Sequence, residues 1–190
     1  SCELDIMNYC SSPSFVNDYF IKCGVYSESY AIGGVVRAFI QKCVSGGKVM
    51  TRNNEKMIVN EDVADYDAVS SYPSAMNEMK GILKGKPKLL KKNECNLKFL
   101  NTVDGYFVKV FCKENPKINR PFPLLSQFDN NGIRNYTNDT KNKVYYLDKY
   151  ALEDAIEFQG LEFDILCGYY YDEGRNMILK ETINLLFNER

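Results

Sequence analysis

The chain has 190 residues, 45% of them hydrophobic and 26% charged, which is the composition of an ordinary globular protein with a sizeable core. Its 24 basic and 25 acidic residues leave a net charge of −1, so the overall charge gives no support for a nucleic-acid partner. A site for such a partner would have to come from a local cluster of basic residues.

The cysteines and the lack of histidine argue against a zinc site. Seven cysteines are scattered along the chain without a C-x-x-C pair, and structural zinc sites need close cysteine pairs or histidine partners. The odd count, the spacing and the lack of a signal peptide indicate reduced thiols and an intracellular location. No apolar run approaches the length of a transmembrane helix, so no membrane partner is expected.

The first elements surround the most informative part of the chain. Residues 1–44 form a connector that contains a glycine pair, Gly33 and Gly34, and VVRAFIQKCV after it predicts a short strand or the start of a helix. Residues 44–59 predict a hairpin around the polar tip TRNNEK. Residues 63–69 are largely small or β-favouring and predict a strand.

A short helix and a basic run follow that strand. PSAMNEMKG predicts a helix with Pro73 at its first position and Gly81 as its stop. The basic run lies in a segment at about residues 82–103 that we interpret as an insertion. In it, lysines alternate with small or turn residues, which suits a loop that tracks a phosphate backbone, although a solvated loop is the plainer interpretation. The lysines concerned are Lys84, Lys86 and Lys88.

The rest of the chain predicts strands and helices without a regular period. A strand is expected to begin at about Gly105, and residues 143–171 predict strand, helix and strand, with Asp148 as the helix N-cap and Gly160 at its end. A last helix begins at about residue 176 and has no stop signal, so we expect the chain to be a piece of a longer protein. These elements predict an α+β fold, with a small mixed or antiparallel sheet and helices packed on one face.

The stretch DYDAVSSYPSAM, residues 65–76, carries the clearest chemistry. If the predicted strand ends near Ser70, Asp67 lies near its carboxyl end, where a carboxylate can hold Mg²⁺ together with substrate phosphates. The turn that follows, and the start of the next helix, present backbone N–H groups that suit a triphosphate. Tyr72 could then lie beneath the nucleotide sugar, where an aromatic ring leaves little room for a 2′-hydroxyl.

DAVSSYPSAM resembles the first polymerase motif of family B DNA polymerases, usually D-x-x-S-L-Y-P. The match lies at Asp67, Ser70, Tyr72 and Pro73, with Ser71 in place of the usual leucine.

Further resemblance lies on both sides of this motif. SYAIGGVV resembles the Y-x-G-G element of the family, which touches the primer–template strand, but Tyr30 stands three residues before Gly33 instead of two. Within this element, the resemblance therefore includes Gly33 and Gly34 but leaves Tyr30 in doubt. The order of the segments from DGYFVKVFCK onward resembles the protein-primed branch, which includes polymerases of some bacteriophages, adenoviruses and virus-like transposable elements. The resemblance covers roughly residues 30–190.

The resemblance implies a palm region, residues 45–190, with the start of a fingers helix at about 176–190. It implies DNA-directed DNA polymerase activity, with template-directed transfer from a dNTP to a primer 3′ end and two Mg²⁺ or Mn²⁺ ions. The implied partners are primer–template DNA, a terminal protein primer, and the exonuclease, fingers and thumb of the polymerase. The implied site residues are Asp67 and the carbonyl of Ala68 for metal, Ser70, Ser71 and Tyr72 for the nucleotide, and Gly33, Gly34, Lys84, Lys86 and Lys88 for DNA.

The sequence also leaves alternatives open. The second and third motifs of the family, K-x-x-x-N-S-x-Y-G and D-T-D-S, are absent, so the chain alone is predicted to be inactive. A reverse-transcriptase-like palm also fits the D-x-x-x-x-Y spacing. A non-catalytic domain that binds nucleic acid or protein, or one half of a split polymerase, fits as well. At single residues, Asp67 could simply cap the helix after Pro73, and Tyr72 could be a core residue.

Overall fold

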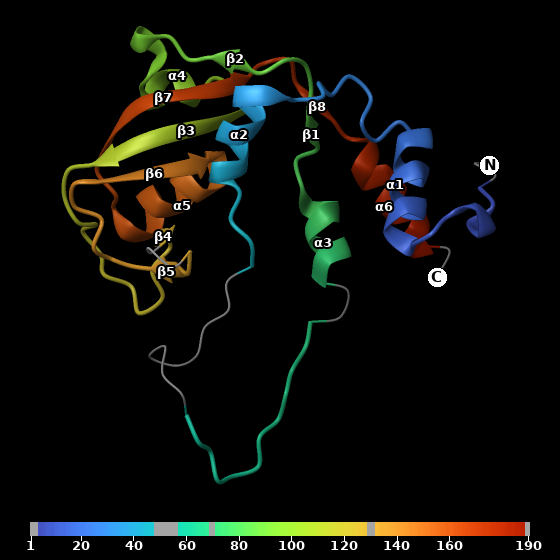
Figure 1. The fold of residues 1–190 in the computed structure, drawn as a ribbon, viewed down its shortest axis with the longest axis horizontal. Helices are drawn as coiled ribbons and strands as arrows, with labels where there is room; N and C mark the ends of the chain where they lie inside the picture. Colours follow the sequence, from blue (N-terminus) through green and yellow to red (C-terminus); the bar gives the residue numbers. More distant parts are fainter. Residues whose placement is uncertain (1–3, 48–56, 69–70, 129–131, 189–190) are drawn as a thin grey trace. The chain divides into compact units, whose positions relative to one another are not determined.

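The computed structural model describes residues 4–47, 57–68, 71–128 and 132–188. Within these ranges the chain forms six α-helices and eight short strands, and the strands pair in antiparallel fashion in three sheets (Figure 1). The predicted α+β class is therefore confirmed. In the described part of the chain, no helix is both long enough and apolar enough to cross a bilayer.

The chain divides into two compact units, and each is described here by itself. The sheet unit comprises Ile32–Asn60 and Pro87–Tyr171. The terminal unit comprises Ser1–Ala31, Glu61–Lys86 and Asp172–Arg190. Each unit draws on separate stretches of sequence, so the two interleave along the chain. The boundary at residue 44 that the sequence predicts for the connector stays a prediction.

The sheet unit is built on a four-stranded antiparallel sheet in the order β2–β7–β3–β6 (Figure 1). In β3, Val108 lies opposite Gly168 of β7 on one side and Leu147 of β6 on the other. The strands predicted from Gly105 onward and within residues 143–171 are thereby confirmed. Their bounds are Lys88–Leu89 for β2, Gly105–Cys112 for β3, Lys143–Asp148 for β6 and Phe163–Tyr171 for β7.

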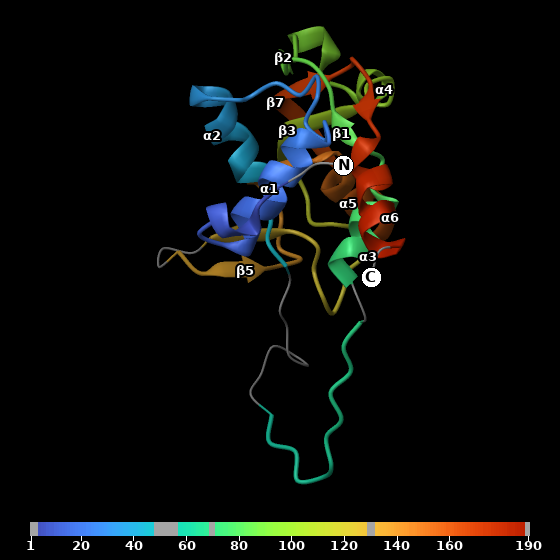
Figure 2. The same cartoon turned by 90° about the vertical axis from the view of Figure 1, so that its right-hand side faces the viewer.

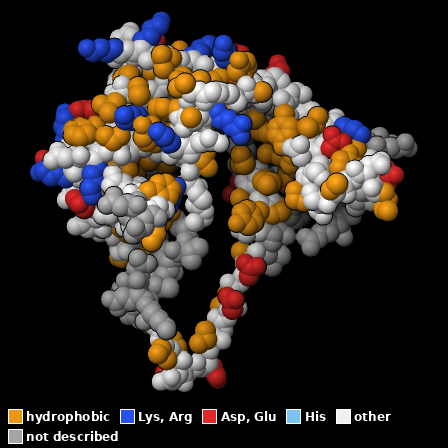
Figure 3. All heavy atoms as spheres, viewed as in Figure 1, with side chains coloured by type: hydrophobic (Ala, Val, Ile, Leu, Met, Phe, Trp, Pro, Cys, Tyr) orange, Lys and Arg blue, Asp and Glu red, His pale blue; other side chains and the backbone are white. Residues whose placement is uncertain are grey.

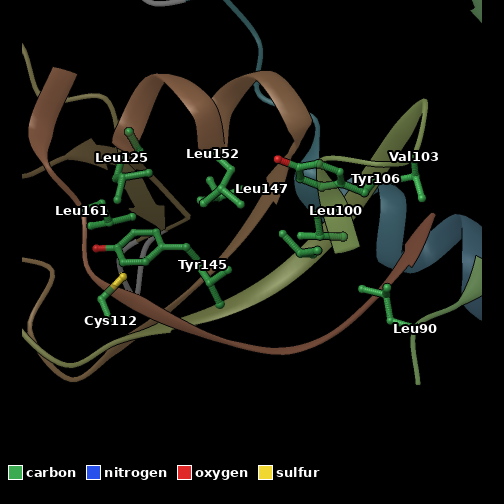
Figure 4. Close-up of a cluster of buried hydrophobic side chains, with 13 residues drawn as sticks. Leu90, Leu100, Val103, Tyr106, Cys112, Leu125, Tyr145, Leu147, Leu152 and Leu161 are labelled. Carbon is green, nitrogen blue, oxygen red and sulfur yellow. The ribbon is translucent and has the colours of Figure 1, made fainter. Parts of the chain in front are cut away.

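One face of this sheet forms the main hydrophobic core. Alternate residues of β3 are buried there, as the two-residue period of a strand requires. Helix α5 (Lys149–Gln159) covers this face, with Leu152 and Ala155 fully buried, and α4 (Leu97–Leu100) adds Leu100. Figure 4 shows Leu152 and Leu147 packed between the helix and the strands.

Helix α5 has the ends that the sequence predicts. The Asp148 carboxylate accepts a hydrogen bond of 2.8 Å from the Ala151 N–H, which caps the first turn. The helix ends at Gly160, which has the left-handed backbone conformation common after a last turn.

Helix α2 (Gly34–Cys43) packs on the opposite face of the same sheet. The Phe39 ring contacts the rings of Tyr146 and Tyr169, with centroid distances of 5.3 and 5.2 Å. Tyr146 is paired with Lys109 and Tyr169 with Phe107, and these β3 residues point away from the α5 core. Helices therefore cover both faces of the sheet, whereas the sequence predicts them on one face.

A buried glutamine positions the irregular segment between β3 and β6. Gln159 is 1% exposed; its Oε1 accepts from the Leu124 N–H at 2.9 Å, and its Nε2 donates to Asn138 Oδ1 at 2.9 Å. Asn138 in turn donates to the Arg120 carbonyl oxygen at 2.8 Å. This network fixes the base of a hairpin formed by β4 (Ser126–Phe128) and β5 (Arg134–Tyr136).

The terminal unit has a small core of its own. Phe20 and Val25 pack with Leu179 and Ile183. Helix α3 lies beside α6, as Figure 2 shows. The elements of this unit are the short 3₁₀ turn Ile6–Asn8, α1 (Ser12–Lys22), α3 (Ser71–Glu78), β1 (Ile82–Leu83), β8 (Arg175–Asn176) and α6 (Ile178–Asn188).

The buried side chain of Asn176 holds the turn after α1. Its Nδ2 lies 3.0–3.2 Å from the carbonyl oxygens of Gly24, Val25 and Ser27, and its Oδ1 accepts from the Ile178 N–H at 2.9 Å. Because buried backbone carbonyls need partners, this one amide ties the turn to the start of α6. The predicted C-terminal helix is confirmed as a helix.

Two predicted β elements differ from the structure. Residues 63–68 form no strand: they are extended, and their side chains are exposed. By the two-residue period of a strand, Ala64, Tyr66 and Ala68 would share an apolar face, but the segment pairs with no strand among the described residues, and β propensity alone does not form a strand. The tip of the predicted hairpin, residues 48–56, lies outside the described residues, and its described flanks, 44–47 and 57–59, are not strands.

Candidate functional site

The motif begins in an extended, solvent-exposed segment of the terminal unit. Asp67 and Ala68 are exposed, and in the described part of the chain no hydrogen bond or ion pair of the Asp67 carboxylate is found. Figure 3 shows acidic side chains spaced along this segment. The carboxylate and the neighbouring carbonyl are thus accessible to a ligand. Ser70, the third predicted site residue of the motif, lies outside the described residues.

The second half of the motif forms the first turn of α3. The helix begins at Ser71, so Pro73 occupies its third position and not the first, which the sequence pattern predicts. The N–H groups of Ser71 and Tyr72 belong to the first turn, where N–H groups have no partner within the helix. The Tyr72 ring is 83% exposed, so the interpretation of Tyr72 as a core residue is wrong.

The interpretation of Asp67 as a helix cap also finds no support in the structure. Helix α3 starts four positions after Asp67, and the residue directly before the helix is Ser70. An N-cap side chain acts from the position adjacent to the first helical residue. Asp67 is therefore not placed as the N-cap of α3.

The metal chemistry of this stretch rests on two oxygen ligands. The Asp67 carboxylate and the Ala68 carbonyl are hard oxygen donors of the kind that Mg²⁺ and Mn²⁺ prefer. They fit part of a coordination sphere. Among the described residues no group of three or more His, Cys, Asp or Glu side chains could hold an ion. A complete two-metal site would need a further carboxylate from outside the described residues.

A second candidate feature of the terminal unit joins two segments far apart in the sequence, residues 28–30 and 84–86; we call it the 28–30/84–86 junction. The Gly85 N–H donates to the Glu28 carbonyl oxygen at 2.8 Å, and Ser29 pairs with Gly85 in an isolated parallel bridge. Lys84 forms an ion pair with Glu28. The Lys86 ammonium lies 5.5 Å from the centre of the Tyr30 ring, within cation–π range.

The backbone at the centre of this junction favours glycine. Gly85 has a φ of +75°, and a Cβ there would overlap the carboxylate of Glu173. A side chain at position 85 would therefore strain the backbone and displace the end of the Glu173 side chain. The approach of the two segments brings an exposed lysine and a half-exposed tyrosine together on the surface.

The junction brings together residues that the sequence pattern does not connect. Lys84 and Lys86 are predicted to contact DNA, whereas Tyr30 departs from the family spacing relative to Gly33. The contact between Tyr30 and Lys86 has no local sequence signal, since it depends on a long-range approach of the backbone.

The other predicted DNA contacts belong to the sheet unit. Gly33 is the extended residue before α2, and Gly34 opens the helix with a φ of +53°. No described atom lies within 4 Å of the position that a Cβ would occupy at either glycine. Lys88 is exposed on β2, the short strand that pairs with Tyr169 and Tyr170 of β7. The predicted site residues are therefore divided between the two units.

Comparisons with protein-family models, with curated proteins and with solved structures find no match for this chain.

Proposed function

We propose that this chain is part of a DNA-directed DNA polymerase of the family B type. The observation that carries the proposal is the motif D-x-x-S-x-Y-P together with the exposure of its functional groups. Asp67 and Ala68 are exposed a few positions before α3 in the sequence, and Tyr72 is exposed in the first turn of this helix. A motif kept only for folding would bury at least the ring.

In this proposal each group has one task. Asp67 and the Ala68 carbonyl would hold metal ions, and the bound ions would lower the pKa of the attacking hydroxyl and stabilise the leaving pyrophosphate. Backbone N–H groups of Ser71 and Tyr72 would donate to the triphosphate, which the positive end of α3 also favours. The Tyr72 ring would lie under the sugar and exclude a 2′-hydroxyl.

The DNA side of the proposal draws on the 28–30/84–86 junction. A lysine held over a tyrosine ring offers a charge for a phosphate and a flat surface for a sugar or base. Gly33 and Gly34 would allow the backbone to approach a primer–template strand. A terminal protein primer, and the remaining polymerase segments, stay as proposed partners.

The first test is the nucleotide sequence that follows the codon for Arg190. The proposal expects K-x-x-x-N-S-x-Y-G soon after it and D-T-D-S further on, since these motifs supply the missing carboxylate. A reading frame that continues through a full domain without either motif would overturn the proposal.

A second candidate function is nucleic-acid binding without catalysis. The 28–30/84–86 junction favours it, because the interaction of Lys86 with Tyr30 involves none of the metal-binding groups. We expect Lys86→Gln and Tyr30→Ala in the 190-residue chain to weaken binding of a labelled primer–template duplex severalfold. In Lys86→Gln the slope of the logarithm of the binding constant against the logarithm of the salt concentration should become shallower by about 0.9, because one phosphate is no longer neutralised.

The matched control is Lys22→Gln, which removes an exposed charge from the end of α1. Equal weakening by this control would show that only net charge matters, and the junction would then have no specific role. Duplex binding that depends on the junction, in a gene without the later motifs, would favour the non-catalytic function over the polymerase.

A further inference from the structure

A groove of about 540 Å³ lies in the sheet unit, and no residue of the motif is among those that line it. One wall is the C-terminal end of α2, and the other is the β4–β5 hairpin. Between them runs β6, which is an edge strand of the four-stranded sheet. The volume is within the range of about 300–1,000 Å³ that small-ligand sites occupy.

The floor of the groove is apolar. Leu125, Tyr145 and Leu147 line it and are 3–7% exposed, so they belong to the main core and are held rigidly. A flat, uncharged group could rest against this floor, because the floor needs no rearrangement to receive it.

The charged side chains of the lining are basic. Lys42 and Arg134 are on the two walls, and no carboxylate is found among the described lining residues. Asp148, which contributes to raising the pKa of the Cys43 thiol in the groove wall, is outside the lining, and its carboxylate caps α5. The two lining cations favour an anion next to them, whereas burial, and then the charge of Asp148, disfavours a negative charge at Cys43.

Each lining cation is placed over an aromatic ring. The Arg134 guanidinium lies 4.6 Å from the centre of the Phe128 ring, its cross-strand neighbour, and Nη1 donates to Ser126 Oγ at 3.1 Å. The Lys42 ammonium lies 5.1 Å from the Tyr146 ring, which a third cation, Lys109, approaches to 5.7 Å. Among the described residues none of these cations has an ion-pair partner.

Phe128 is held out to solvent, with 64% of its surface exposed. A single exposed apolar ring is normal on a protein surface, but this one lies beside an arginine and is accessible to a flat ligand. Rings that alternate with cations are the surface on which nucleobases stack while their phosphates are neutralised.

We infer that this groove binds a nucleotide unit, with the base against the exposed Phe128 ring and the phosphate near Lys42 and Arg134. The unit can come from a free nucleotide or from a single-stranded nucleic acid. The inference does not rest on the proposed polymerase function, because it uses none of the residues of the motif or of the 28–30/84–86 junction.

The test measures binding to the 190-residue chain by fluorescence anisotropy, with labelled oligo-dT and, in a separate arm, labelled dTMP. The double variant Lys42→Gln/Arg134→Gln should lower oligo-dT affinity at least tenfold and reduce the salt slope by about 0.7 for each phosphate that is no longer neutralised. Phe128→Leu keeps apolar bulk and removes the ring face, and should weaken binding about fivefold. Thermal unfolding of each variant checks that the fold is retained.

Three further variants provide the controls. Lys98→Gln removes an exposed lysine of α4 that does not line the groove, and it should leave binding unchanged. Asp67→Asn should also leave groove binding unchanged, so failure of the polymerase proposal and failure of this one can be told apart. Lys22→Gln, which removes an exposed lysine from the end of α1, should have no effect in these assays.

Comparing the binding of oligo-dT with that of dTMP shows which kind of ligand the groove takes, and some results would contradict the inference. Binding of dTMP that responds to the groove variants identifies a free-nucleotide site, and binding of oligo-dT alone identifies a strand site. The inference is wrong if neither probe binds, if the groove variants bind as the parent does, or if Lys98→Gln weakens binding equally. It is also wrong if an acidic peptide binds in the groove and oligo-dT does not.

Discussion

Tyr72 is the single residue whose placement separates the interpretations of the motif most clearly. Its ring is 83% exposed in the first turn of α3, although tyrosine rings usually gain by partial burial. An exposed ring five positions after an exposed carboxylate in the sequence fits a role in holding a ligand. Because the Tyr72 ring is exposed, we do not expect it to contribute much to the stability of the folded state.

In a polymerase that contains this chain, we expect Tyr72→Ala to raise ribonucleotide incorporation about tenfold or more relative to deoxyribonucleotides. The ring would no longer exclude the 2′-hydroxyl, and specificity built on such an interaction disappears with it. The ratio of kcat/KM for rNTP and dNTP measures the effect. Tyr66→Ala, which removes an even more exposed ring from the same segment, is the control and should leave the ratio unchanged.

Individual residues also show what the sequence could and could not predict. The role of Asp148 as a helix cap was predictable, since its partner Ala151 is three positions away. The role of Asn176 was not, because its carbonyl partners lie at the other end of the sequence. The same reason hides the contact between Tyr30 and Lys86 from a local pattern.

Among the elements, β3 and β7 approach closely at Gly168. A Cβ at this position would overlap the Phe107 carbonyl oxygen and lie 2.9 Å from Val108 Cγ1. The strand register shifts close by, between Lys109 and Val110. This pairing of two long strands therefore depends on a residue without a side chain.

Gly168→Ala is expected to lower the free energy of unfolding by about 1–3 kcal/mol, because the strands must separate to admit the methyl group. Urea denaturation followed by circular dichroism measures the change. Gly46→Ala, where no described atom lies within 4 Å of the new methyl group, is the control. Equal stability of the Gly168→Ala variant and the parent would show that the strands are not as closely apposed as described.

The predictions from sequence were correct for elements whose pattern of buried and exposed residues determines the structure. Strand β3 alternates buried and partly exposed residues, and α5 has a polar cap and a final glycine, so sequence and structure agree. The segment 63–68 has β-favouring residues but pairs with no described strand, and its strand prediction was wrong because strands form only against a partner. For α2 the sequence left strand and helix open, and packing of Phe39 on the sheet accompanies the helix.

At the scale of the whole molecule, the buried thiols of the sheet unit link stability to pH. Burial raises the pKa of the Cys43 thiol to about 12 and that of the Cys112 thiol to about 11, both from 9.0. The folded state thus keeps these protons at a pH where the unfolded chain loses them. Their contribution to stability is complete below about pH 9 and is lost as the pH rises toward 11 and 12.

We expect the midpoint of urea denaturation to fall between pH 9 and pH 11, and to fall less steeply in the variant Cys43→Ala/Cys112→Ala. Burial also raises the pKa of Tyr106 and Tyr145, so both proteins should lose stability at the highest pH. An identical pH profile in parent and variant would contradict the assignment of this effect to the thiols.

The two compact units separate the chemistry of the molecule. The terminal unit carries the exposed motif around Asp67 and the 28–30/84–86 junction, and the sheet unit carries the glycine pair and the cationic groove. The composition, with a net charge of −1, gives no sign of either basic feature, because both depend on a few local side chains. Such features become visible only once the fold brings distant residues together.

The most direct measurement is primer extension by a polymerase that contains this chain, with Asp67→Asn compared with Asp65→Asn. Both aspartates are exposed in the same extended segment, so the two changes are matched in charge and surroundings. The account predicts that Asp67→Asn abolishes extension while primer–template binding persists, and that Asp65→Asn extends as the parent does. Extension by Asp67→Asn at the parent rate would contradict the assignment of this motif to nucleotidyl transfer.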